Sequence, residues 1–325
     1  MLADNGPPAD VPPPSFSGPA LASATHAGPR RERFGLALKN AVQRAFVKGI
    51  SRPRARRGAR SCVWRLPLPD AVLERLPIAG RFVFAAYGSR FTYSAGLTDP
   101  VGRALFWRRT EEYEPETLPV LVEYLRSART FVDVGANTGV FSLVAVAVNS
   151  QVSVHAFEPS ADVFAALQAN VAANGLKDQV TCSRVAVGAV LGSVPLHIPA
   201  ETWGNARIGT DGFRGLAGHV EDVPCTTLDA YVADLGLEAV DVVKVDVEGL
   251  EHLVLEGARH TLRRHRPVLV CECLPEADTE SLERVLRDCG YSSYHLTATG
   301  PQPVEHVVPD PTDRFKNFLF LPVER

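Results

Sequence analysis

The chain has 325 residues, of which 46% are hydrophobic and 22% charged. This composition supplies enough apolar surface for a full core and excludes a fibrous or wholly disordered protein. The net charge of -3 hides two regions of opposite sign, because residues 1–60 carry 11 Lys+Arg against 3 Asp+Glu and the rest carry 23 against 34. A body with a net charge of about -11 disfavours binding to a phosphate backbone.

The compartment follows from what the sequence lacks. Six cysteines are scattered without the close pairs of a zinc site or a disulfide framework. Apolar runs stay short of the ~20 residues that span a bilayer, and the first residues do not resemble a signal peptide. We therefore expect a cytoplasmic protein in a reducing environment, without a transmembrane segment.

Residues 1–60 are predicted to form an arm. Residues 1–29 contain seven prolines among Ala, Ser and Gly, a composition that buries too little apolar surface to offset chain entropy. We expect this part to be disordered. Residues 30–60 are basic and have one apolar stripe with the spacing of a short helix. A solubilising arm or a short packing helix is favoured over contact with an anionic surface or nucleic acid.

Residues 61–128 are predicted to form a small N-terminal cap on the catalytic domain. Short strand-like runs at 82–84 and 91–93 precede a helical pattern over 116–126.

From residue 129 to 325 short apolar runs alternate with helical patterns, as in a sheet built from βαβ units. Strands are predicted at 130–134, 152–157, 180–187, 241–246, 267–273, 291–296 and 315–321. Helices are predicted at 139–148, 161–174, 250–265 and 279–289. No helical pattern separates the last two strands, so the final strand should return antiparallel. The fold class is therefore α/β, with a doubly wound, mostly parallel, seven-stranded Rossmann-like sheet.

Residues 190–226, rich in Gly and Pro, form a long insertion, and such insertions are usually functional or mobile.

A glycine turn follows the first strand of this domain. The segment Phe131–Gly139 carries an acid at the strand end and two glycines four residues apart. Such a turn lies at the carboxyl edge of the sheet, where ligands bind. A dinucleotide turn needs a third glycine, which is missing, so an NAD-linked dehydrogenase is disfavoured. The methionine moiety of S-adenosylmethionine (SAM) fits better, and the candidate cofactor residues here are Asp133, Gly135, Ala136, Asn137 and Gly139.

Glu158 ends the second strand about twenty residues beyond the turn. A carboxylate at this place accepts hydrogen bonds from ribose hydroxyls in nucleotide folds. Pro159 stiffens the turn, and Ser160 is placed to cap the next helix. We predict that Glu158 and Pro159 contact the cofactor.

Between about Tyr113 and Pro322 the sequence resembles the FkbM family of SAM-dependent methyltransferases. The segments that carry the resemblance are Tyr-Glu-Pro at 113–115, Asp-Val-Gly-Ala-Asn-Thr-Gly at 133–139, Phe-Glu-Pro-Ser at 157–160, Ala-Val-Gly at 186–188, Thr-Leu-Asp at 227–229, Lys-Val-Asp-Val-Glu-Gly at 244–249 followed by Glu251, and Asn-Phe-Leu-Phe at 317–320. The resemblance implies SAM as cofactor, with Ala186 among its contacts. It also implies O-methylation of a hydroxyl on a sugar, polyketide or related metabolite.

Carboxylates at the end of the fourth strand are the candidates for chemistry. Asp246 and Glu248 lie at the same edge as the glycine turn, and Asp246 is also a candidate cofactor contact. Lys244 needs a carboxylate partner if it is buried. His252, four residues after Glu248, would share its face if both were helical. We predict Glu248 as base or orienting group, Asp246 as its support and His252 as reserve.

The acceptor is not identified by these patterns. Candidate substrate residues are Tyr113, Glu114, Glu272 at the end of the fifth strand, and Trp203 and Asn205 in the insertion. We expect a small-molecule hydroxyl acceptor, no nucleic acid and no bound metal. Two alternatives stay open: a non-catalytic module with this fold, and an RNA methyltransferase recruited through the basic arm.

Overall fold

The computed structural model describes residues 76, 78–96, 99–107, 113–199, 206–208, 217–312 and 314–323. All of them lie in one compact unit, residues 46–325. The predicted arm at residues 1–60 and the candidate substrate residues Trp203 and Asn205 lie outside the described residues.

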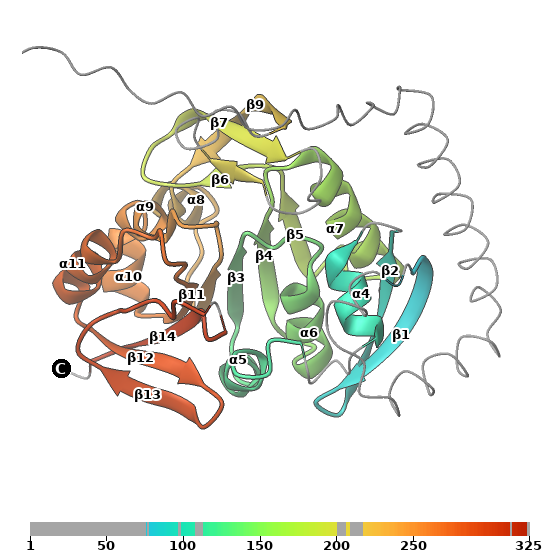
Figure 1. Ribbon diagram of the computed structural model, residues 1–325, viewed down its shortest axis with the longest axis horizontal. Coiled ribbons are helices and arrows are strands. Elements are labelled where there is room, and N and C mark those ends of the chain that lie inside the picture. Colours follow the sequence, from blue (N-terminus) through green and yellow to red (C-terminus); the bar gives the residue numbers. More distant parts are fainter. Residues whose placement is uncertain are drawn as a thin grey trace, which may run out of the picture. The chain divides into compact units, whose positions relative to one another are not determined.

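The larger sheet confirms the predicted α/β fold class. Within the described residues it has eight strands in the order β13-β12-β14-β11-β10-β3-β4-β5 (Figure 1). This is one more than the seven predicted, because the edge strand β13, which pairs with β12 as a hairpin, was not predicted. Strands β5, β4, β3, β10 and β11 are parallel, and β14 lies antiparallel between β11 and β12. The predicted antiparallel return of the last strand is therefore confirmed. The bounds are β3 (Thr130–Val134), β4 (Ser153–Phe157), β5 (Val180–Ser183), β10 (Val242–Val245), β11 (Val268–Glu272), β12 (Tyr291–Thr297), β13 (Gly300–Val304) and β14 (Asn317–Pro322).

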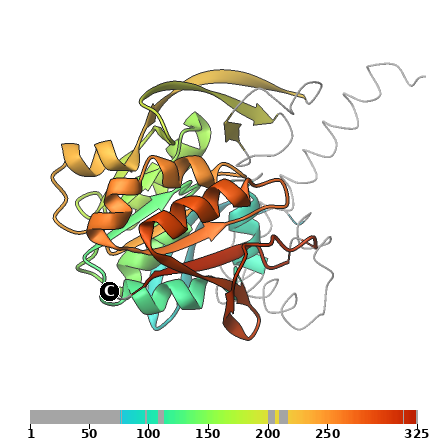
Figure 2. The same cartoon turned by 90° about the vertical axis from the view of Figure 1, so that its left-hand side faces the viewer.

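In the central strands, successive residues enter opposite layers of the core. On β3, Phe131 belongs to the apolar cluster that holds α6 (Val140–Val148) and α7 (Ala161–Ala173), whereas Val132 belongs to the cluster on the other face. Alternation of this kind, with both faces apolar, is what a sheet covered by helices on both sides requires. The second face is covered by α8 (Leu228–Asp234), α9 (Glu251–Glu256), α10 (Arg259–His265) and α11 (Thr279–Cys289) (Figures 1 and 2).

Two predicted elements are divided in the structure. The helix expected over 250–265 is two helices, because Gly257 packs against another segment: a Cβ there would lie 2.0 Å from the carbonyl oxygen of Gly188. The carboxylate of Asp229 accepts hydrogen bonds from the N–H groups of His260 and Thr261 and so caps the second helix. The strand expected over 180–187 ends at Ser183, and β6 (Ala186–Val187) joins a different sheet.

The predicted insertion builds that second sheet. Its order is β6-β9-β7-β8, with β7 (Gly192–Pro199), β8 (Arg207–Ile208) and β9 (Gly218–Thr226). Leu196, Val223 and Cys225 form its small apolar core. In Figure 1 this sheet lies at the top, beyond the ends of β4 and β5. The described part of the insertion is thus ordered β structure that borders the carboxyl edge of the larger sheet.

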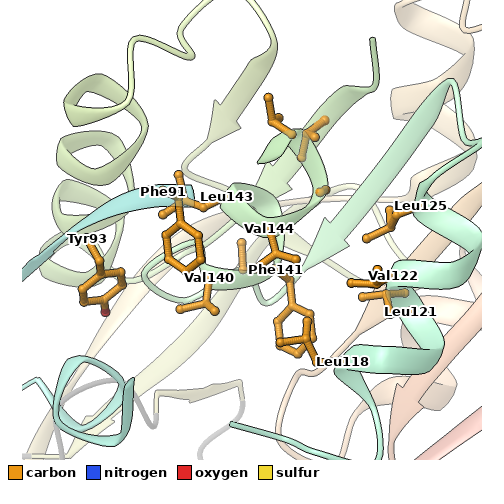
Figure 3. Packing of buried hydrophobic residues seen from close by; sticks show 14 of the residues in the cluster. Phe91, Tyr93, Leu118, Leu121, Val122, Leu125, Val140, Phe141, Leu143 and Val144 are labelled. Atoms are coloured by element: carbon orange, nitrogen blue, oxygen red, sulfur yellow. The ribbon is translucent and has the colours of Figure 1, made fainter. Parts of the chain in front are cut away.

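The residues before β3 pack on α6 and α7. A hairpin of β1 (Gly80–Ala86) and β2 (Ser89–Ala95) precedes α4 (Pro100–Trp107), which sequence reasoning did not predict, and α5 (Leu118–Leu125). Figure 3 shows the rings of Phe91 and Tyr93 on β2 at one side of α6. The apolar side chains of α5 approach α6 from the other side of the view. These residues share one continuous apolar cluster with the sheet.

Among the described residues, none of the helices combines the length and apolarity needed to cross a membrane. The cysteines in this part of the chain are free thiols.

Candidate active site

A pocket opens at the carboxyl ends of β3, β4, β10 and β11. It encloses about 760 Å³ including its open mouth, which is within the usual range for small-molecule sites. Eight predicted site residues line it: Gly135, Asn137, Glu158, Pro159, Ala186, Asp246, Glu248 and Glu272.

Sequence reasoning missed the apolar wall of the pocket. Leu196 and Ile208 come from β7 and β8, and Ala206 lies just before β8. The alternation of Val194, Leu196 and Ile198 was the available signal, since period-two apolar residues indicate a strand. Leu196, Ala206 and Ile208, together with Val185 and Val187, make one end of the pocket apolar.

Both glycines of the turn have positive φ angles and no room for a side chain. Gly135 has φ +76°, and a Cβ there would lie 1.8 Å from the carbonyl oxygen of Asp246. Gly139 has φ +90°, and a Cβ there would meet Leu167 at 2.6 Å. The missing side chain of Gly135 leaves room for the turn after β10, and Gly135 also lines the pocket. The two turns that border the pocket are therefore in direct contact.

Glu158 stands in the pocket wall and is only 7% exposed. Its Oε1 accepts a hydrogen bond from the N–H of Ser160 at 2.9 Å and its Oε2 from the N–H of Asn137 at 3.1 Å. Each carboxylate oxygen can accept a further hydrogen bond. Burial outweighs these two donors and raises the pKa of Glu158 to about 7.

Asp133, a candidate cofactor contact, points elsewhere. It is fully buried, does not line the pocket, and its Oδ2 accepts a hydrogen bond from the hydroxyl of Ser142 at 2.7 Å. Burial raises the pKa of Asp133. Ala136 and Gly139 also lie behind the pocket lining. The structure thus places these three residues in support of the turn.

The opposite end of the pocket is acidic. The Nζ of Lys244, buried beneath it, lies 2.8 Å from Asp246 Oδ2, so the carboxylate partner expected for Lys244 is present. The cation lowers the pKa of Asp246 against the opposing effect of burial. Burial and the charge of Asp246 raise the pKa of Glu272, whose Oε1 lies 3.8 Å from the Nζ of Lys316. Of the two carboxyl groups, Glu272 is therefore the one whose pKa is raised and Asp246 the one whose pKa is lowered.

Glu248 lies in the turn between β10 and α9. It has φ +60° and precedes Gly249 with φ +100°, so it is not helical. The prediction that Glu248 and His252 share a helical face is therefore wrong. His252 does not line the pocket.

Glu251 fixes this turn, a role that sequence reasoning missed. Its side chain is fully buried, and its Oε1 accepts hydrogen bonds from the N–H groups of Val247 at 3.2 Å and Gly249 at 3.1 Å. Its Oε2 is buried without a hydrogen-bond partner among the described residues. Burial raises the pKa of Glu251 to about 7. The only sequence signal was its place in the segment that follows the fourth strand.

Tyr113 and Glu114 lie next to the acidic end without lining the pocket. The ring of Tyr113 is 6.3 Å from that of Phe141, and the amide of Asn317 donates to Glu114 Oε2 at 3.4 Å. Burial raises the pKa of Glu114 to about 7, although Lys244 opposes the shift. Within the described part of the chain, no group of three or more His, Cys, Asp or Glu side chains is arranged to hold a metal ion.

Comparison with known proteins adds to this geometry. Residues 133–293 match the family described as the methyltransferase FkbM domain. The chain is 28% identical over 187 residues to methyltransferase sdnD of Sordaria araneosa, covering 49% of this chain and 72% of that protein. It is 31% identical over 157 residues to 31-O-demethyl-FK506 methyltransferase FkbM of Streptomyces tacrolimicus, covering 41% of this chain and 60% of that protein. A crystal structure of methyltransferase FkbM from Methylobacillus flagellatus superposes with a TM-score of 0.40 at 18% identity, covering 69% of this chain and 54% of the other.

Proposed function

Because residues 133–293 belong to the FkbM methyltransferase family, we propose that the protein transfers a methyl group from SAM to a hydroxyl of a small metabolite. The observation that carries this proposal is the pocket itself. It has a buried carboxylate, Glu158, that can accept hydrogen bonds, and it has one apolar end and one acidic end. The name of one relative supports oxygen as the acceptor atom, since that enzyme acts on an O-demethyl substrate.

The pocket fits the parts of SAM. Glu158 has free lone pairs on both oxygens for the ribose hydroxyls. The apolar side chains of Val185, Leu196 and Ile208 suit an adenine ring. The turn that contains Gly135 and Asn137 would hold the methionine part. When bound, SAM supplies an activated methyl group on a sulfonium.

The protein's own residues would then orient the acceptor and receive its proton. Asp246, kept ionised by Lys244, is a strong hydrogen-bond acceptor and a weak base. Glu272, whose pKa is raised by burial and by the charge of Asp246, is the carboxyl group at this end that more readily keeps a proton and donates a hydrogen bond. This combination suits a hydroxyl, which is both donor and acceptor. Glu248, at the pocket wall, is our candidate for the base or the orienting group.

Single-turnover kinetics tests the assignment of Glu248. Orientation of reactants supplies the larger share of such a rate, and a positioned base typically adds 10²- to 10⁴-fold. Glu248→Gln should therefore bind SAM normally and transfer the methyl group at least roughly a hundredfold more slowly.

The matched control is Glu256→Gln, which removes the same charge from an exposed position on α9 that pairs with Arg259. It should transfer at the wild-type rate. If Glu248→Gln transfers the methyl group at a near-normal rate, Glu248 has a structural role only. If the wild-type protein binds SAM but methylates no hydroxyl in a panel of sugars and polyketides, it is a binding module instead.

A further inference from the structure

A buried polar contact joins the N-terminal hairpin to the glycine turn. The hydroxyl of Tyr93 on β2 lies 2.7 Å from Thr138 Oγ1 and 2.9 Å from Asp99 Oδ2. Tyr93 is 0% exposed, Thr138 1% and Asp99 2%. Tyr93 and Asp99 lie upstream of the residues that match the family, whereas Thr138 belongs to the turn that borders the pocket.

The chemistry of this contact is restrictive. A tyrosine hydroxyl has one proton, so it satisfies two neighbours only by donating to one and accepting from the other. Burial and the charge of Asp99 raise the pKa of Tyr93, so the phenol keeps its proton. Asp99 is itself fixed, because its Oδ1 accepts the N–H of Gly102 at 2.9 Å at the start of α4. Losing the Tyr93 hydroxyl would leave two buried polar groups short of a partner.

A second bridge holds the backbone of the same turn residue. The amide of Asn170 on α7 donates to the carbonyl oxygen of Thr138 at 2.9 Å, and its Oδ1 accepts the N–H of Ser94 at 2.7 Å. Asn170 is fully buried. Strand β2 therefore reaches Thr138 both through its hydroxyl and, by way of Asn170, through its carbonyl group.

The residue next to Thr138 has a demanding conformation. Asn137 has φ +50°, a left-handed backbone that costs a non-glycine residue free energy unless its surroundings enforce it. In this conformation its N–H donates to Glu158 Oε2, and its side-chain oxygen accepts the N–H of Thr138 at 2.8 Å. Fixing Thr138 thus helps to fix the donor that orients Glu158.

We propose that Tyr93 is a positioning residue for the cofactor, acting through Thr138 on Asn137 and Glu158. The hairpin, although outside the matched family residues, is then part of the cofactor site. This inference rests on the proposed function, since it requires that the pocket binds SAM.

Calorimetric titration with SAM tests it at a temperature where every variant is fully folded. Tyr93→Phe and Thr138→Val, each of which removes one hydroxyl with little change of shape, should weaken binding by roughly five- to twentyfold, as expected for loss of a buried hydrogen bond. Thr138→Ser keeps the hydroxyl and should bind nearly as the wild type does. The double variant should bind SAM no more weakly than the weaker-binding single variant, because the two substitutions remove the same hydrogen bond.

The matched control is Tyr291→Phe. It also deletes a buried hydroxyl, which donates to the carbonyl oxygen of Pro267 at 3.0 Å, but Tyr291 lies in the cluster on the other face of the sheet and outside the pocket lining. It should lower the melting temperature to a similar extent and leave SAM affinity unchanged. Wild-type affinity in Tyr93→Phe, or an equal loss in Tyr291→Phe, would overturn the inference alone. Failure of the wild-type protein to bind SAM would overturn the proposed function and this inference together.

Discussion

At the scale of single residues, the proposed role of Glu158 predicts that cofactor binding depends on pH. Its pKa of about 7 leaves it half protonated at neutral pH, whereas ribose hydroxyls donate to the charged form. Binding should therefore lower this pKa and release a proton. Affinity for SAM should be constant above pH 8 and fall by up to about tenfold for each unit below pH 7.

The comparison that isolates this effect is Glu158→Gln, because Glu114 and Glu251 also have pKa values near 7. The variant should bind more weakly at high pH and lose most of the slope. Titrations from pH 6 to pH 8.5 give both curves, and parallel slopes would assign the proton to another group.

Glu251 should reduce stability at high pH. Its folded pKa of about 7 is above the ordinary value of 4.5, so its contribution is most favourable below pH 4.5 and is lost as pH rises through 7. Gln at this position resembles the protonated acid and keeps the oxygen that accepts from Val247 and Gly249. We expect Glu251→Gln to be as stable as the wild type near pH 4 and more stable at pH 8, by up to about 3 kcal/mol.

Urea unfolding at the two pH values measures the difference between the proteins, which cancels the shifts of His155 and His265 that are common to both. A variant that is less stable than the wild type at pH 8 would show that the charged carboxylate, and not its neutral form, fits the turn.

At the scale of elements, the sequence pattern predicted the bounds of those helices and strands that depend on local contacts. The strand at Thr130–Val134 and the helix at Thr279–Cys289 have the predicted bounds, since the first is a continuous apolar run and the second has a strong amphipathic pattern with Asp278 as its cap. The break near Gly257 was not predictable, because it depends on the carbonyl of Gly188 some seventy residues earlier along the chain.

The residues of the candidate site also divide into those that local sequence patterns predicted and those that depend on long-range contacts. The turn residues that follow parallel strands, such as Gly135, Glu158 and Asp246, were predictable because strand ends of a parallel sheet meet at one edge. The apolar wall was not, since the pairing of β7 with β8 and β9 is set by long-range contacts within a Gly- and Pro-rich segment. His252 was misplaced because a spacing of four residues brings two side chains together only within a helix.

The wall from the smaller sheet supports a prediction of its own. If Ile208 packs against the adenine ring, Ile208→Ala should weaken SAM binding by roughly five- to twentyfold through lost apolar burial. Ile198→Ala is the control, because Ile198 packs on the same small apolar core without lining the pocket. Calorimetry with SAM and with adenosine should show the loss for both ligands; a loss shared by Ile198→Ala would indicate disruption of the sheet.

At the scale of the whole molecule, three parts of the chain that are distant in sequence converge on one pocket. The parallel strands supply Glu158 and Asp246, the smaller sheet supplies the apolar wall, and the N-terminal hairpin holds the glycine turn from behind. Lys244 lies under the acidic end between the sheet and the ring of Phe141, with its Nζ 4.4 Å from the ring centroid. The core and the site are thus built from the same strands, which accounts for the several buried carboxyl groups with raised pKa values.

Whether the pocket binds SAM through Glu158 is measured by calorimetric titration of the wild-type protein and Glu158→Ala with SAM. We expect one SAM bound per wild-type chain and a dissociation constant about ten- to a hundredfold larger for Glu158→Ala, since a lost charged acceptor costs roughly 1.5 to 3 kcal/mol. If the wild-type protein does not bind SAM, or if the variant binds it with the wild-type dissociation constant, Glu158 is not the ribose ligand of a SAM site.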